Sequence, residues 1–240
     1  MYKDAKGVIF DIDGTLADSW QLGFEATQVI LENNGISRIT EEVYHDHTRY
    51  CTPDRLARHA GLMPGDPDFE SVGERLGKEF DDLYVGLVSM KTAPFYPGVQ
   101  EMLVSVPSHV KIGALTNAAE KYAHAVLETN CPETQASLKA EDTKSDIVIY
   151  KRFGSIRGAD TVPKPKPHPD GLFQVCQEMG VRPEDCVYIG DSPSDGASAH
   201  AANMPAIGVV WGSHKEESLR NAPFAHICRS VEELRALLPQ

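Results

Sequence analysis

The chain has few basic residues, few cysteines and no long apolar run. Its 240 residues carry 23 Lys and Arg against 35 Asp and Glu, a formal charge of −12. A surface that binds a nucleic-acid backbone is therefore not expected. Five scattered cysteines without a Cys-x-x-Cys pair argue against disulfides and zinc and favour a reducing compartment.

No apolar segment approaches the roughly 20 residues needed to span a bilayer, so no membrane partner is expected. The first apolar run begins almost at the N-terminus and leaves no room for a targeting segment. We therefore expect a cytoplasmic protein. Its length predicts one or two domains, and 41% hydrophobic residues are enough for a sizeable core.

Two carboxylates follow the first apolar run, at a point where acid is unusual. Residues 8–10 read as a buried strand, and Asp11, Asp13 and Gly14 come directly after it. A strand that breaks at glycine places these acids at its exit, facing a cleft. The alternative is a strand followed by a solvated acidic turn, which a short motif alone does not exclude.

Two further apolar runs also end in polar groups. Residues 110–115 lead to Thr116 and Asn117, and residues 186–190 lead to Asp191, with Asp195 four residues later. Such side chains often only cap the next helix. The same junctions also bind anions, because the first turn of a helix offers unpaired N–H groups and a positive dipole end.

A proline-rich segment precedes a predicted helix at Asp170–Met179. Four prolines alternate there with Lys164, Lys166 and His168, which makes the segment extended and stiff. A free linker of this composition is the alternative. Taken together, the strand ends and the braced lysine favour a ligand site beyond the carboxyl ends of a parallel sheet.

These motifs, in this order, resemble the haloacid dehalogenase superfamily. Its phosphatases carry Asp-x-Asp-Gly-Thr, a strand-terminal Thr, a Lys ahead of a helix and Gly-Asp-x-x-x-Asp, and the match extends over essentially the whole chain. Residues 157–162, followed by Lys-Pro, look most like the phosphoglycolate phosphatase branch. The polar run from Cys131 to Tyr150 departs from that branch and reads as a surface loop or as a helix that meets a partner.

The resemblance implies the fold and the domains. We expect an α/β protein with a three-layer α/β/α Rossmann-like core, a mainly parallel sheet and an inserted α-helical cap. The catalytic core would comprise residues 1–17 and 95–240. The cap would comprise residues 18–94, whose apolar spacing is helical.

The resemblance also implies the role of each site residue. Asp11 would be the nucleophile, forming an aspartyl-phosphate, and Asp13 would be the general acid and then the base. Thr116, Asn117 and a lysine would bind phosphate oxygens. The Asp11 carboxylate, the Asp13 backbone carbonyl and Asp191 would bind Mg²⁺, and Asp195 would lie in the metal shell, ligating directly or through water.

A separate physical reason supports the metal. Two like charges about 4 Å apart repel by roughly 4 kcal/mol at an effective dielectric near 20, so Asp11 and Asp191 need a cation to stay ionised side by side. An all-oxygen site that also meets a phosphate suits Mg²⁺. The lysine and the metal would then offset charge on the transferring group.

Two lysines compete for one role. Lys164 and Lys166 both fit Lys-Pro-x-Pro, and we predict Lys166 because its interval to Asp191 is the usual one in the superfamily. In the cap, Arg49 is a candidate partner for a substrate carboxylate. A solvated helix start at that position, with Pro53 in its first turn, is the alternative.

The predicted activity is hydrolysis of a small phosphorylated metabolite by a monomer or homodimer. In this superfamily, an acid at Asp13 favours phosphate chemistry over carbon–halogen cleavage. A phosphoryl-transferring mutase would keep the same motifs, since the cap decides whether water enters. A phosphate-binding module without turnover is the third possibility, although no catalytic position is lost.

Overall fold

The computed structural model describes residues 2–131 and 149–240. The polar run between Cys131 and Tyr150, for which the sequence allowed a loop or a helix, lies outside the described residues from 132 to 148.

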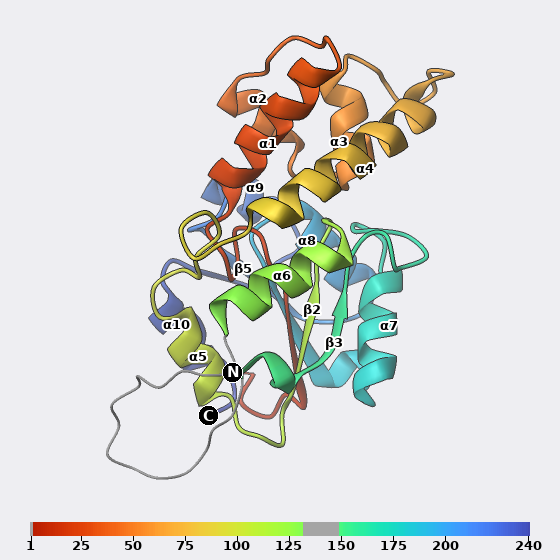
Figure 1. The fold of residues 1–240 in the computed structure, drawn as a ribbon. Coiled ribbons are helices and arrows are strands. Elements are labelled where there is room, and N and C mark those ends of the chain that lie inside the picture. The colour runs from red at the N-terminus through yellow and green to blue at the C-terminus, as the bar shows by residue number, and fades with distance from the viewer. Residues whose placement is uncertain (1, 132–148) are drawn as a thin grey trace.

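One parallel sheet forms the centre of the molecule (Figure 1). Its strands are β1 (Gly7–Phe10), β2 (Lys111–Leu115), β3 (Phe153–Arg157), β4 (Cys186–Gly190), β5 (Ala206–Val209) and β6 (His226–Cys228). Their spatial order is β3-β2-β1-β4-β5-β6, and every pair is parallel. The order reverses beside β1, where open α/β sheets bind ligands.

Helices cover both faces of this sheet. They are α5 (Val99–Ser105), α6 (Glu120–Asn130), α7 (Asp170–Met179), α8 (Pro193–Ala201), α9 (Glu216–Arg220) and α10 (Val231–Leu237). Val8 and Phe10 of β1 pack with α5, α6 and α10, whereas Ile9 packs with α7 and α8 on the other face. Alternate side chains of a strand point to opposite faces, so both faces of β1 are buried. The predicted three-layer α/β/α fold is confirmed.

The predicted helix at Asp170–Met179 has those bounds. The helix that follows Asp191 begins at Pro193. The Ser192 side chain accepts from the backbone N–H of Ser194, and the Asp195 side chain accepts from the backbone N–H of Ser192. This capping box, with proline in the first turn, starts the helix next to the end of β4.

Four helices gather at the carboxyl end of the sheet (Figure 1). They are α1 (Trp20–Asn33), α2 (Glu41–His47), α3 (Thr52–His59) and α4 (Phe69–Leu87). Two segments join them to the sheet. These segments run side by side, because Asp18 N–H donates to Pro94 O at 2.8 Å and Tyr96 N–H donates to Leu16 O at 2.9 Å.

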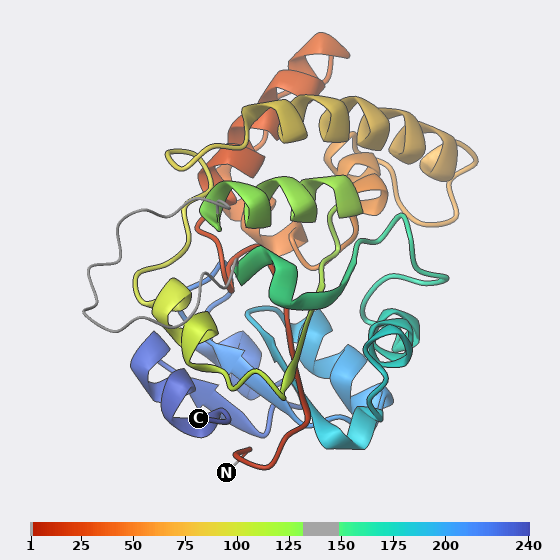
Figure 2. The same cartoon turned by 60° about the horizontal axis from the view of Figure 1, so that its bottom comes forward.

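The two ends of the chain lie together on the opposite side of the molecule (Figures 1 and 2). There Tyr2 N–H donates to Leu237 O at 3.1 Å. None of the helices in residues 2–131 and 149–240 has the length and apolar content to cross a membrane.

The packing of α3 against α4 depends on a close approach at Gly73. A Cβ atom there would lie 2.7 Å from the Pro53 carbonyl oxygen, which is backbone and cannot move away cheaply. Gly86, in the same helix, faces open space.

We therefore expect Gly73→Ala to lower the free energy of unfolding by about 1–3 kcal/mol through overpacking, despite the better helix propensity of alanine. Gly86→Ala is the matched control and should be neutral or slightly stabilising. Thermal unfolding followed by circular dichroism measures both. A Gly73→Ala melting temperature equal to that of Gly86→Ala would contradict the packing account.

Candidate active site

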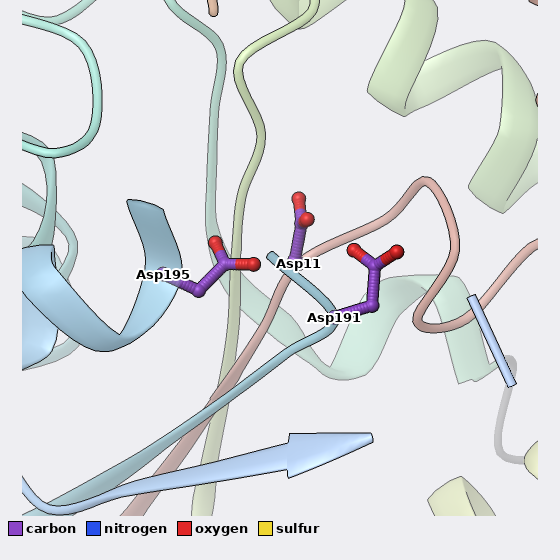
Figure 3. A group of neighbouring side chains, drawn as sticks. All are labelled: Asp11, Asp191 and Asp195. Carbon is purple, nitrogen blue, oxygen red and sulfur yellow. The ribbon is translucent and has the colours of Figure 1, made fainter. Parts of the chain in front are cut away.

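Three carboxylates converge where β1 and β4 end (Figure 3). Asp11 follows β1, Asp191 follows β4, and Asp195 lies in the first turn of α8. One carboxylate oxygen from each lies within 4.8 Å of the others, and all three residues are buried. Adjacent parallel strands bring their carboxyl ends to one edge, so acids from opposite ends of the chain meet there.

Gly14 explains why glycine follows the two acids of the first motif. Its φ is +75°, a conformation that other residues rarely adopt. A Cβ atom at this position would lie 2.3 Å from Asp191 Oδ2. The turn after β1 therefore needs glycine both for its backbone conformation and for the close approach of Asp191.

Lys166 is the cation among these acids. Its Nζ lies 3.0 Å from Asp11 Oδ1 and 2.7 Å from Asp195 Oδ1, and it also donates to Tyr188 Oη and Leu115 O. Its side chain is only 2% exposed. Burial alone would lower the pKa of Lys166, but the two carboxylates outweigh burial and raise it above its ordinary value. The other candidate, Lys164, is exposed.

The segment that carries Lys166 is held by Asn117. The Asn117 amide nitrogen donates to Lys166 O at 3.1 Å, and its amide oxygen accepts from Lys166 N–H at 3.0 Å. Both polar atoms of this side chain therefore bind the backbone that positions the lysine. Thr116, after β2, is also buried, and its hydroxyl accepts from Ala118 N–H and donates to Asp13 Oδ2 at 3.4 Å.

Asp195 differs from the other two acids in how its oxygens are used. Oδ1 accepts from Lys166 and Tyr188, and Oδ2 accepts from the backbone N–H of Ser192. By contrast, among the described residues Asp11 uses only Oδ1, for Lys166 and Ile12 N–H, and Asp191 uses only Oδ2, for Ser213 N–H at 2.7 Å.

One oxygen each of Asp11 and Asp191 therefore has no hydrogen bond from the described residues. Both residues line the same pocket. Carboxylate oxygens are hard ligands, so these two oxygens fit a divalent cation. Both oxygens of Asp195 already accept hydrogen bonds, so Asp195 is suited to support the site by holding Lys166 in place.

The electrostatics show the same need for a cation. Burial raises the pKa of Asp11 well above its ordinary value. Lys166 opposes this rise, whereas the charges of Asp195, Asp191 and Asp13 add to it. A divalent ion at the unused oxygens would favour the ionised carboxylate and reverse the imbalance.

Asp13 is held by hydroxyl groups. Tyr122 Oη donates to Asp13 Oδ1 at 2.6 Å, Ser19 Oγ donates at 2.5 Å, and Tyr84 Oη lies 3.4 Å from the same oxygen. Burial raises the pKa of Asp13, while the bonds from Ser19 and Tyr122 lower it in part. A carboxyl group in such a place can keep a proton and give it to a leaving oxygen.

Two stacked tyrosines join α4 to α6, one of the helices that cover the sheet. Tyr84 belongs to α4 and Tyr122 to α6. Their rings lie 4.1 Å apart at 14°, and Tyr84 Oη donates to Tyr122 Oη at 3.0 Å. The position of α4 is therefore coupled to the hydrogen bonds of Asp13.

A pocket of about 80 Å³ lies over these residues. Its walls include Asp11, Asp13, Thr116, Asn117, Lys166 and Asp191, all of them predicted site residues. Asp195 does not line the pocket, although it contacts Lys166, which does.

Arg49 does not reach this pocket. Its side chain is exposed, and its Nε donates to Asp46 O at 2.7 Å. Arg55, six residues later, lines the pocket instead. The site also uses Ser19, Tyr84, Tyr122 and Tyr188, which sequence reasoning missed. The only signal was the closeness of Ser19 to the first motif, since the tyrosines lie in helix or strand patterns that read as core.

A model of the haloacid dehalogenase-like hydrolase family matches residues 8–209, which include Asp11, Asp13, Lys166 and Asp191. The chain belongs to this family. It is 28% identical over 243 residues to a phosphoglycolate phosphatase of Nitrosococcus oceani, and this match covers 100% of this chain and 99% of that protein. It is 25% identical over 253 residues to a phosphoglycolate phosphatase of Escherichia coli K12, and this match covers 97% of this chain and 92% of that protein.

Solved structures of this hydrolase family share the fold. A putative phosphoglycolate phosphatase from Lactobacillus delbrueckii subsp. bulgaricus superposes with a TM-score of 0.77 at 22% identity, over 99% of this chain and 100% of that one. A putative haloacid dehalogenase-like hydrolase from Bacteroides fragilis gives 0.76 at 21% identity, over 96% and 99%.

The two lysines of the proline-rich segment give a direct test of the site in this hydrolase. We expect Lys166→Ala to lower kcat/KM for a phosphate ester by about 10²-fold or more, because an uncompensated charge cluster remains around Asp11. Lys164→Ala should change it less than about threefold, since surface substitutions act weakly. Steady-state kinetics measures both, and equal losses would show that the lysine register is wrong.

Proposed function

We propose that this hydrolase removes phosphate from a small, phosphoglycolate-like metabolite with Mg²⁺ and an aspartyl-phosphate intermediate. The enzyme class follows from the family and its relatives: the chain is a phosphoric monoester hydrolase. The substrate, the metal and the covalent intermediate are the proposed part. The observation that carries them is the placement of Asp11 beside both Lys166 and Asp191.

Asp11 is the nucleophile of the proposed reaction. One of its oxygens attacks phosphorus and forms the aspartyl-phosphate, while the bond from phosphorus to the substrate oxygen breaks. Asp13 gives its proton to that leaving oxygen and then takes a proton from the attacking water, which releases inorganic phosphate. The hydroxyls of Ser19 and Tyr122 support this role, because they fix the Asp13 carboxyl group in the pocket.

The remaining residues bind charge. Asp11, Asp191 and the Asp13 backbone carbonyl would hold Mg²⁺, which when bound offsets negative charge on the phosphoryl group. Lys166 and the Thr116 hydroxyl bind phosphate oxygens. Asn117 contributes through its backbone N–H, because its side-chain amide already binds Lys166.

Helices α1–α4 serve as a cap in this proposal, corresponding to residues 18–94 over a core of residues 1–17 and 95–240. The two segments that join these helices to the core lie side by side at Asp18 and Pro94, which supports a hinge there. The exposed side chain of Arg49 gives no support for its predicted role at the substrate. The free thiols of the five cysteines fit a cytoplasmic location.

Asp11→Asn tests the nucleophile. With Mg²⁺ present, we expect the protein to hydrolyse p-nitrophenyl phosphate, and we expect Asp11→Asn to lower kcat by about 10³-fold or more, because an amide cannot form the acyl phosphate. Activity should disappear with EDTA and return with Mg²⁺. Asp4→Asn, at an exposed turn, is the matched control and should retain full activity.

Other outcomes would separate the alternatives. Equal activity of Asp11→Asn and the unchanged protein would contradict the covalent route. Release of the alcohol without an equal amount of free phosphate would favour a phosphoryl-transferring mutase. Silence on p-nitrophenyl phosphate and on a panel of phosphorylated metabolites would favour a binding module.

A further inference from the structure

Arg55 is a buried cation in the wall of the pocket, and all four cap helices contribute to its surroundings. It lies on α3 and is 5% exposed. Its Nη1 donates to Thr27 Oγ1 of α1 at 2.8 Å. Its Cζ lies 5.2 Å from the centroid of the Tyr44 ring of α2 and 4.7 Å from that of the Phe80 ring of α4. These contacts orient the guanidinium group.

Arg55 forms no ion pair with any of the described residues. Its charge acts only from farther away on Asp81, whose pKa is raised by burial and lowered in part by Lys121 and Arg55. The one hydrogen bond found for its five N–H donors goes to the neutral hydroxyl of Thr27, and no carboxylate oxygen of residues 2–131 and 149–240 lies within ion-pair distance. Arginine is almost never buried unless it is paired. A partner from outside the chain would complete this arrangement.

The other cation of the pocket is already engaged. Among the described residues that line the pocket, Arg55 and Lys166 are the only lysine or arginine residues. Lys166 contacts Asp11 and Asp195 at the core end of the pocket. Arg55 comes from the cap, so a ligand bound at the core end has a second cation available on the cap side.

The size of the pocket limits the ligand. Its volume of about 80 Å³ is well below the roughly 300–1,000 Å³ of pockets for drug-sized ligands. A molecule that meets both walls must therefore be short. A guanidinium group binds carboxylate oxygens in pairs, and a carboxylate is the smallest common anion that matches its planar fork.

We propose that Arg55 is a specificity residue, which binds the carboxylate of a short phosphorylated acid whose phosphate lies at Asp11 and Lys166. This inference rests on the proposed phosphatase function and assigns the residue that binds the carboxylate of its substrate. It also explains why a charged residue occupies the centre of the cap. A side chain needed only for packing there could be apolar, since apolar replacement of buried ionic groups is often neutral or stabilising.

Two esters that differ in one group test this proposal on the unchanged protein. The substrate 2-phosphoglycolate ends in a carboxylate, and 2-hydroxyethyl phosphate ends in a hydroxyl at the same position. We expect kcat/KM to be at least about tenfold higher for the acid, the effect of one charge-assisted hydrogen bond. Equal values would overturn the proposal, and no variant is needed to see this.

Variants then assign the preference to a residue. We expect Arg55→Met to reduce the acid-to-neutral ratio of kcat/KM by about tenfold or more, chiefly through KM for the acid. Arg55→Lys should keep part of the ratio, because the charge remains but the planar fork is lost. Arg49→Met is the matched control, an exposed cap arginine, and should leave the ratio unchanged.

The remaining outcomes are decisive. Equal loss on both esters in Arg55→Met would show a role in cap packing alone, and a change of ratio in Arg49→Met would return the role to Arg49. Circular dichroism shows whether Arg55→Met is folded. If it is not, the acid-to-neutral ratios of kcat/KM for Arg55→Lys and for the unchanged protein test the proposal instead. Failure of the unchanged protein to hydrolyse either ester, by contrast, would overturn the phosphatase function itself.

Discussion

The buried ammonium group of Lys166, between the carboxylates of Asp11 and Asp195, is the interaction on which the rest of the site depends. A buried carboxylate is costly unless it is paired, and Asp11 also faces the charges of Asp191 and Asp13. Lys166 balances part of this charge. Asp11 and Asp191 each keep one oxygen that receives no hydrogen bond from the described residues, and their remaining negative charge explains why a divalent cation is expected.

The cap is connected to this charge cluster by particular contacts. Tyr84 of α4 stacks on Tyr122 of α6, and both hydroxyl groups approach Asp13, the proposed acid and base. Arg55, on α3, places a positive charge in the wall of the same pocket. In the proposed mechanism the cap both encloses the substrate and supplies groups that act on it, which is why the fold alone does not define the substrate.

The sequence predicted the core of the site because its residues end strands. Asp11, Thr116 and Asp191 each follow an apolar run, and parallel strands bring such positions to one edge whatever their distance along the chain. The cap could not be read in this way. Arg49 and Arg55 are six residues apart, and only the start of α3 at Thr52 decides which one faces inward. Tyr122 was missed because a tyrosine on an amphipathic helix reads as core.

A crystal structure with saturating Mg²⁺ tests the central claim most directly. Our account predicts one ion bound by Asp11, Asp191 and the Asp13 backbone carbonyl, with metal–oxygen distances of about 2.0–2.1 Å and the contact between Lys166 and Asp195 intact. An empty site at saturating Mg²⁺, or an ion bound to Asp195 with Lys166 displaced, would contradict it.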